Sequence, residues 1–312
     1  MPEPINDLLV LSEMLNDSFQ VTYADYLNRK SNWSNQLILP APCRNRKIHF
    51  PFIYDGADLD IVNEGDPPAY NTLLGQDVSI ALKAVKGGVS IRQIDFEDPM
   101  YQNQLFAQVK GLGIKAAYHN NRRLVNALIN GDTDTYYTMY DGELLFSNSH
   151  SIGGYSFDNL GAGTLSATSF AEAKTKLRQI PWGSKGEYLP MEGSTFYLVV
   201  PPQLSYTAKA LMKNTWDPAD NKYTENILRG EAEVIVDEQL GDDADDWYLI
   251  AELPDMKPFV NVYHQTLNSM NLVPEVDPSS DAVKNHDEYR WSLKMFRETF
   301  PTHFWLMIKY VN

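Results

Sequence analysis

Residues that could form a hydrolytic site lie close together between positions 141 and 150. Ser149 could act as a nucleophile, His150 as its base, and Asp141 as the acid that orients the base. A serine nucleophile usually sits on a strained Gly-x-Ser-x-Gly turn, and the sequence has no such turn here. A turn whose hydroxyl groups bond the local backbone is the more ordinary interpretation. We therefore predict no catalytic residue and keep a cytoplasmic α+β serine hydrolase as an alternative function.

Residue types that bind metals and phosphates do not occur at the spacing that such sites require. The six histidines include no pair four residues apart, and Cys43 is the only cysteine. Asp132 with Asp134, and the acidic run at 242–246, could offer oxygen ligands to Ca²⁺, but neither has the spacing of a known calcium loop. Solvated acidic turns explain both groups better. The glycines between 153 and 163 lack the Gly-Lys-Ser/Thr of a phosphate loop, so we predict no metal and no cofactor.

The longest element predicted near these residues is one helix over 99–129. Asp98 is suited to cap its first turn, Pro99 to occupy its first position, and Asn130-Gly131 to end it, with Gly131 in the left-handed conformation. At 1.5 Å per residue this helix would be about 45 Å long. One apolar stripe with helical spacing is predicted to be buried, and it consists of Leu105, Val109, Leu112, Ala116, Ala117, Leu124, Val125 and Leu128.

Two segments before this helix are predicted to lack a core of their own. Residues 1–31 have the apolar spacing of an amphipathic helix, with no obvious partner in the sequence. Residues 46–93 contain short alternating runs interrupted by turn residues such as Gly87-Gly88, which is typical of a β-excursion. Its apolar content is low, and a projecting two-stranded ribbon needs a partner surface to be stable.

The elements after the long helix are short and mixed. Ser169 and Glu172 have the spacing of a capping box for a helix that ends near residue 180. The terminal strands, 289–295 and 304–311, are predicted to pair with each other. The other predicted elements are strands at 196–200, 234–236 and 247–250 and a helix at 203–213. This order of strands and helices predicts an α+β fold.

Composition limits the classes of function. The chain has 312 residues, 43% of them hydrophobic, which is typical of a globular protein. Its net charge of −15 argues against a protein that reads nucleic-acid sequence, because such proteins present a basic face. No apolar run is long enough to predict a membrane span. A single cysteine fits a reducing cytoplasm.

Taken in order, these segments make the chain resemble the major head (capsid) subunit of Mu-like tailed bacteriophages, a family with the Hong Kong 97 phage capsid fold. Agreement runs nearly end to end but is low over 214–229 and 273–288. The resemblance is carried by Leu15-Asn16-Asp17-Ser18-Phe19, Asn63-Glu64-Gly65, Asp95-Phe96-Glu97-Asp98, Tyr140-Asp141-Gly142 with Leu145-Phe146 and Ser149-His150, residues 197–202, residues 232–236 with Trp247-Tyr248-Leu249, and Lys257-Pro258.

The family implies a division into four parts. Residues 1–45 would be an N-terminal arm and 46–93 an extended loop. A peripheral domain would comprise 94–150, with its spine helix at 99–129, and would be completed by return strands in 258–312. Residues 151–257 would form an axial domain. The glycine-rich stretch 151–166, together with Gly111 and Gly113 in the helix, would then allow the bending that accompanies expansion of a precursor shell.

The function that the resemblance implies is that of a major capsid protein, which is not an enzyme. Copies would assemble as hexamers and pentamers into an icosahedral head around the DNA genome. The implied partners are other copies, separate scaffold, portal and decoration proteins, and packaged double-stranded DNA bound without sequence specificity, with no membrane. The implied location is the virion, after assembly in the host cytoplasm. An encapsulin-like compartment of the same fold is the alternative within this class.

Overall fold

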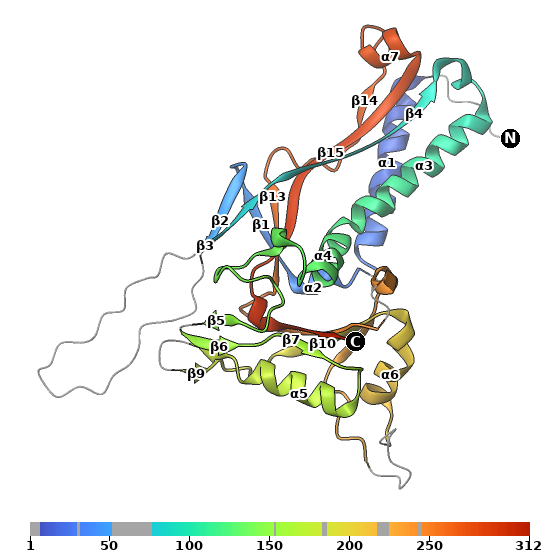
Figure 1. The fold of residues 1–312 in the computed structure, drawn as a ribbon. Coiled ribbons are helices and arrows are strands. Elements are labelled where there is room, and N and C mark those ends of the chain that lie inside the picture. Colours follow the sequence, from blue (N-terminus) through green and yellow to red (C-terminus); the bar gives the residue numbers. More distant parts are fainter. Residues whose placement is uncertain are drawn as a thin grey trace, which may run out of the picture.

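The computed structural model describes residues 7–29, 32–51, 77–152, 154–182, 186–216, 225–242 and 245–312. The chain forms two units (Figure 1). We call the elongated one the ribbon unit; it holds the helices α1 (Leu8–Leu27) and α3 (Pro99–Ala117) and the long strands β4 (Lys83–Arg92) and β15 (Glu288–Pro301). We call the other the sheet unit; it is built around the strands β10 (Thr195–Val200), β12 (Trp247–Glu252) and β16 (Met307–Val311). Helices and strands are mixed in both, which confirms the predicted α+β class.

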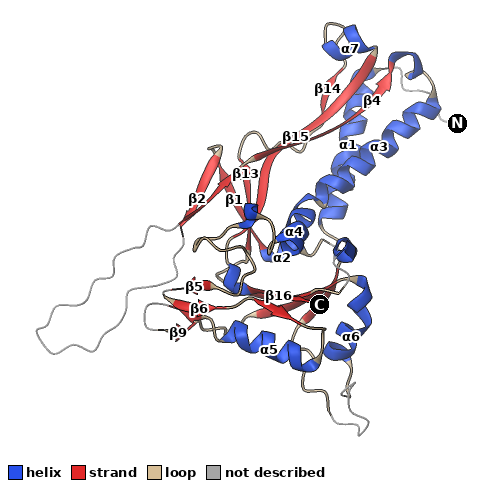
Figure 2. Cartoon of the chain, viewed as in Figure 1, coloured by secondary structure: helices blue, strands red, loops and turns tan. Residues whose placement is uncertain are grey.

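The ribbon unit consists of two layers, and its helices lie on one side of its strands (Figure 2). Strands β4 and β15 run antiparallel, from Lys83 opposite Arg297 to Arg92 opposite Glu288. On β15, Trp291, Leu293 and Met295 point to the helices and are at most 2% exposed, because alternate side chains of a strand point to opposite faces.

Helix α1 packs within its own chain, which the sequence did not reveal. Its buried stripe of Leu11, Leu15 and Phe19 lies in one core cluster with Leu105 of α3 and Trp291 of β15. The indole nitrogen of Trp291 also donates a hydrogen bond to Ser12 Oγ, at 2.9 Å. The prediction that the N-terminal helix has no partner in the chain is therefore wrong. The partners of α1 lie 90 to 280 positions away in the chain, and no local sequence pattern indicates contacts over that distance.

The predicted helix over 99–129 is divided at Tyr118 into α3 and α4 (His119–Asn130). Asp98 caps α3 by accepting from the Met100 N–H, with Pro99 at the first position, as predicted. At the division, Asn32 Nδ2 donates to the Ala117 carbonyl over 3.1 Å. A side chain that inserts into the backbone ladder is a known cause of helix interruption.

The end of α4 is correctly predicted at Asn130, but the conformation of Gly131 is not. Gly131 has a φ of −68°, in the right-handed region, so it is no left-handed cap. A Cβ at this position would lie 2.5 Å from the Ala127 carbonyl oxygen and 2.9 Å from the side chains of Leu145 and Phe146. Glycine is needed here because the following chain folds back tightly over the helix end.

The sheet unit contains a five-stranded sheet in the order β11 (Glu233–Val236), β10, β12, β16 and β7 (Leu160–Ala162). Helices α5 (Ala167–Arg178) and α6 (Ser205–Lys213) lie beside it (Figure 1). Its central strands carry consecutive buried side chains, for example Leu249 and Ile250 at 0% exposure. Both faces are therefore covered, and the strands predicted at 196–200, 234–236 and 247–250 are confirmed.

The terminal strands do not pair with each other, so that prediction is wrong. Strand β15 pairs antiparallel with β4 in one five-stranded sheet, whereas β16 pairs antiparallel with β12 in the other. The short helical turn 304–306 separates the two strands. Residues 258–312, predicted as return strands of one domain, are thus divided between the two units, because the turn sends the last strand to the other sheet.

The remaining elements complete the sheet of β4 and β15, connect the two units or extend from them. The segment predicted as a β-excursion over 46–93 contributes a small two-stranded sheet and then β4; residues 52–76, including Asn63-Glu64-Gly65, lie outside the described residues. These other elements are α2 (Ser34–Leu37), β1 (Ile38–Cys43), β2 (Lys47–Pro51), β3 (Asp77–Ala81), β5 (His150–Ile152), β6 (Tyr155–Phe157), β8 (Pro181–Trp182), β9 (Glu187–Tyr188), β13 (Phe259–His264), β14 (Val273–Glu275) and α7 (Asp281–His286).

The capping box of α5 is shifted by one helical turn from its predicted place. Ser166 caps the helix, and Ser169, predicted as the cap, is its reciprocal partner at the third position. Ser166 accepts from the Ser169 N–H, and Ser169 Oγ accepts from the Ser166 N–H. Ser166 and Ser169 thus form the capping box that was predicted for Ser169 and Glu172.

Candidate assembly surfaces

His150 is placed as a structural residue and not as a general base. It is fully buried, its ring stacks on Phe304 with 4.0 Å between centroids, and both ring nitrogens face acceptors. Nδ1 lies 2.7 Å from Asp141 Oδ2, and Nε2 lies 3.2 Å from the Leu145 carbonyl oxygen. Burial alone would raise the pKa of Asp141, but the hydrogen bond and charge of His150 outweigh it and lower that pKa.

The serines beside His150 bond with each other and with the local turn. Ser147 Oγ lies 3.1 Å from Ser149 Oγ and donates to Glu143 Oε2 over 3.1 Å. Because the free nitrogen of a catalytic base must face the nucleophile, and Nε2 of His150 faces a carbonyl, the hydrolase arrangement is not formed. The histidine instead joins β5 to the turn at 138–146 through its hydrogen bonds, and it packs on the helical turn 304–306 through Phe304.

The acidic groups considered for Ca²⁺ are used by the protein itself. Lys309 is 3% exposed; its Nζ lies 3.2 Å from Asp132 Oδ1 and 3.3 Å from Asp246 Oδ2. Asp134 caps the next turn by accepting from the Tyr136 N–H. Among the described residues, no group of three or more histidine, cysteine, aspartate or glutamate side chains is placed to hold a metal ion. These carboxylates balance a buried cation.

Buried polar groups also fix the middle of the molecule, where the two units meet. Asp237 is 4% exposed and accepts from Trp33 Nε1 over 2.7 Å and from Asn121 Nδ2 over 2.8 Å. Glu298 of β15, 2% exposed, pairs with Arg123 of α4. Because a buried carboxylate without partners costs several kcal/mol, of order 3–5, these bonds hold the units in one arrangement. The sequence offered no means of pairing such distant residues.

Several large apolar side chains are left on the surface without a partner in the described part of the chain. On α1, Val10, Met14 and Val21 lie on the side away from the core, and Val21 is 71% exposed. Ile94, at the turn between β4 and α3, is 87% exposed. In the sheet unit, Ile227 is 85% exposed. Single exposed apolar residues are ordinary, but residues of this size at the ends and outer faces are available for contacts between subunits.

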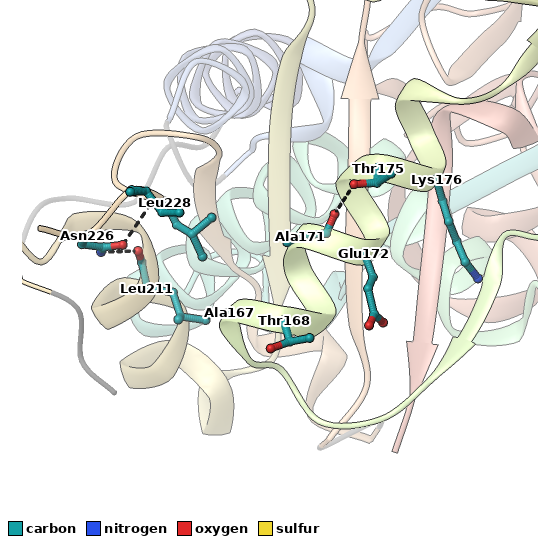
Figure 3. Close-up of a pocket in the computed structure, with 10 residues that line it drawn as sticks. Ala167, Thr168, Ala171, Glu172, Thr175, Lys176, Leu211, Asn226 and Leu228 are labelled. Carbon is teal, nitrogen blue, oxygen red and sulfur yellow. Dashed lines mark hydrogen bonds between the residues drawn. The ribbon is translucent and has the colours of Figure 1, made fainter. Parts of the chain in front are cut away.

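The sheet unit also has an apolar groove on its surface. It has a volume of about 680 Å³ and lies between α5 and the turn at 226–228 that follows α6 (Figure 3). Small side chains of α5, Ala167 and Ala171, form one wall, and Leu211 and Leu228 form the other. Asn226 holds the second wall by donating to the Leu211 carbonyl over 2.8 Å. Its lining also includes Glu172 and Lys176, which lie four positions apart on α5.

None of the described helices is both long and apolar enough to cross a membrane.

Comparison of the sequence with protein-family models identifies one match, described as phage capsid protein, over residues 77–296. That range covers more than half of the chain and spans both units. No curated protein matches the sequence.

Several solved structures share the fold of this chain. The procapsid subunit of bacteriophage JBD30 has a TM-score of 0.53 at 14% identity, covering 99% of this chain and 76% of that one. The capsid of a native GTA particle has a TM-score of 0.56 at 11% identity, covering 91% of each chain. A structure of Mycobacterium phage Patience has a TM-score of 0.54 at 12% identity, covering 98% and 88%. The predicted Hong Kong 97 fold is confirmed by these likenesses.

Proposed function

The chain belongs to the family of phage capsid proteins, and we propose that it is the Mu-like major head subunit, which closes into hexamers and pentamers of an icosahedral shell. The observation that carries the proposal is the family match, which spans both units of a tailed-phage capsid fold. A capsid protein acts by making contacts, which implies a non-enzymatic role and a place in the virion.

Assembly of this kind follows from contacts between unlike surfaces of identical copies. Such heterologous contacts close into rings when the rotation between neighbours allows it, and rings can then join into a shell. We call the face of β4 and β15 that points away from α1 and α3 the open face of the ribbon. Three surfaces are available for these contacts: the open face of the ribbon, the outer side of α1 and the groove beside α5. The subunit interfaces should bury thousands of Å² per copy, as obligate interfaces do, on the order of 2,000–5,000 Å².

The four-part division is kept as a proposal, with two changes. Helix α1 packs on α3 and β15 and would belong to the peripheral domain, and β16 pairs with β12 and would belong to the axial domain. The segment 46–93 would overlap a neighbouring copy from its base at β2 and β3. The ribbon unit would be the peripheral domain, and the sheet unit the axial domain. Separate scaffold, portal and decoration proteins, packaged DNA bound without sequence specificity, and assembly in the host cytoplasm are part of the same proposal.

Two alternatives make different predictions. An encapsulin-like compartment would enclose a cargo protein instead of DNA, and the family match favours the phage head. A serine hydrolase would need His150 as a base, and its two nitrogens face Asp141 and the Leu145 carbonyl. We therefore expect no esterase activity in the wild type, and we expect His150→Ala to lower stability.

Negative-stain electron microscopy of the purified protein, with its sedimentation profile, tests the proposal. We expect rings, sheets or closed shells of tens of nanometres. A stable species of one to four subunits under all salt and concentration conditions, also after co-expression with a candidate scaffold protein, would contradict it. DNA inside particles from the native source would distinguish a phage head from a compartment.

A further inference from the structure

The open face of the ribbon carries two lysines with no acidic neighbour on that face. Lys86 of β4 lies directly opposite Lys294 of β15, and both are exposed. Directly opposite residues of an antiparallel pair have Cβ atoms about 5 Å apart, and like charges placed so destabilise a sheet. Within the described residues, neither lysine forms an ion pair. The neighbours two positions away on the same face are uncharged: Ala84, Gly88, Ser292 and Phe296.

Other cations of this face are balanced, which sets the lysine pair apart. Arg290 Nε lies 3.0 Å from Glu288 Oε2, and Arg92 is directly opposite Glu288. Glu275 of β14 is opposite Arg290 on the other side. A chain of net charge −15 therefore keeps two adjacent positive charges beside three small side chains and the ring of Phe296, whose centroid lies 5.0 Å from Lys294 Nζ. A carboxylate group from outside the subunit would relieve their repulsion.

A matching surface lies at the far end of the same unit, at the turn that joins β4 to α3 (Figure 1). We call residues 94–98 the acidic tip: it carries Asp95, Glu97 and Asp98, and its Ile94 is 87% exposed. The sequence has no lysine or arginine from 93 to 109. The tip is held in one shape, because Phe96 is buried and its carbonyl accepts from Gln102 Nε2 over 2.7 Å.

The tip cannot reach the lysine pair of its own subunit. Arg92 lies six positions after Lys86 on β4, which is about 20 Å along an extended strand. The two surfaces are thus different places on one rigid unit. Contact between them has to join two copies, and a contact of that kind is heterologous, as rings and shells require.

We propose that the acidic tip of one copy docks on the lysine pair of a second copy. Asp95 and Glu97 face Lys86 and Lys294, and Ile94 covers the small side chains beside Phe296. This inference rests on the proposed function, because it names one contact of the shell. Copies of an acidic chain repel one another, so a contact that places carboxylates on lysines supplies local attraction and fixes which surfaces meet.

Reciprocal charge reversal tests this contact in the full-length protein. K86E/K294E places four acidic groups against one another, and D95K/E97K places four basic groups together; each should raise the protein concentration needed for assembly at least about tenfold, or about 1.4 kcal/mol. The quadruple variant restores opposite charges and should assemble within about threefold of wild type. The control K110E/K115E makes the same change in net charge on exposed positions of α3 and should have a smaller effect.

The results separate this inference from the proposed function. Assembly of both double variants at the level of the control, or a folded quadruple variant that does not recover, overturns the docking while the capsid function stands. Failure of the wild type to form particles counts against the proposed function itself.

A second measurement covers the case in which a reversed variant does not fold. In shells of I94C/S292C, with both lysines and both acids intact, oxidation should give disulfide-linked ladders on a non-reducing gel. I94C alone and S292C alone serve as controls, since Cys43 is buried. Shells of the double cysteine variant that yield only monomer overturn the docking.

Discussion

The two units of the subunit are stabilised in different ways. In the sheet unit, neighbouring residues such as Leu249 and Ile250 are both fully buried, because the five-stranded sheet is covered on both faces. In the ribbon unit, Leu293 is 2% exposed while its neighbour Ser292 lies on the open face. One unit has a complete core, and the other leaves one side of β4 and of the first part of β15 for something outside the subunit.

This difference separates folding from assembly within one chain. A sheet covered on both faces can form without a neighbour, since the apolar side chains of its central strands are buried within the same chain. A ribbon with one open face places polar and small residues on that face. The copy that binds there then determines which contacts these residues make. Substitutions should therefore affect the two units in different patterns.

The largest expected effects test this contrast along single strands. In β12, Leu249→Ala and Ile250→Ala should each lower the free energy of unfolding by about 2–5 kcal/mol, because both remove buried side chains. In β15, Leu293→Ala should lower it by a similar amount, whereas its neighbour Ser292→Ala should change it by less than about 0.5 kcal/mol.

Urea denaturation of unassembled protein, followed by circular dichroism, measures these four values. Equal losses at positions 292 and 293 would mean that the open face is covered within the subunit. A small loss at either position 249 or 250 would mean that the sheet unit is covered on one face only.

A smaller effect is expected from pH, and it concerns the point where the helix is divided. Burial, with Arg297, Arg123 and Arg122 nearby, lowers the pKa of His119 to about 4. An unfolded histidine titrates near 6.5, so between about pH 6.5 and 4 the unfolded chain binds more protons than the folded one. The free energy of unfolding should therefore fall as the pH is lowered through this window.

The variant His119→Gln should reduce this slope, because the replaced group no longer titrates; a remaining slope is expected from His303, since burial lowers the pKa of that histidine to about 4 as well. His286→Gln, which removes an exposed histidine of α7, is the matched control. Urea midpoints between pH 7 and 4 measure the effect. A profile of His119→Gln that keeps the full wild-type slope would show that other groups cause the acid sensitivity.

Elements with local signals were predicted well. The start of α3 follows from Asp98 and Pro99, whose side chain and fixed φ act on the next few residues alone. Strand β10 follows from a run of apolar residues that ends at two prolines. The resemblance to a capsid family depended on such local pieces in the right order, which is why the fold could be reached from one sequence.

Features that depend on distant residues could not be predicted. The register that sets Lys86 opposite Lys294 joins strands some 200 positions apart. The division at Tyr118 involves Asn32, which lies 85 positions from Ala117. The residue types at 141 and 150 left a catalytic interpretation open, and only the structure shows that Nε2 of His150 is already used by the Leu145 carbonyl.

The smallest expected effects come from the two glycines of α3, and they sharpen the account of how the ribbon unit is packed. A Cβ at Gly113 would lie 3.2 Å from the Phe19 carbonyl oxygen and 3.3 Å from Thr22 Cβ of α1, whereas a Cβ at Gly111 would meet nothing within 4 Å. Gly113→Ala should lower stability by about 1 kcal/mol because α1 must move away. Gly111→Ala should raise it by about 0.5–1 kcal/mol through helix propensity alone.

The pair also tests the suggestion that both glycines serve bending during shell expansion. Helix α3 runs unbroken through both positions, and Gly111 has open space, so close packing on α1 explains Gly113 and nothing in the subunit requires Gly111. If bending of α3 drives expansion, Gly111→Ala should impair expanded heads although it stabilises the subunit. Normal heads from Gly111→Ala would show that bending at this position is not needed, and reduced stability of Gly113→Ala would assign Gly113 to packing on α1. The division at Tyr118 would then be the place where this helical segment can change its angle.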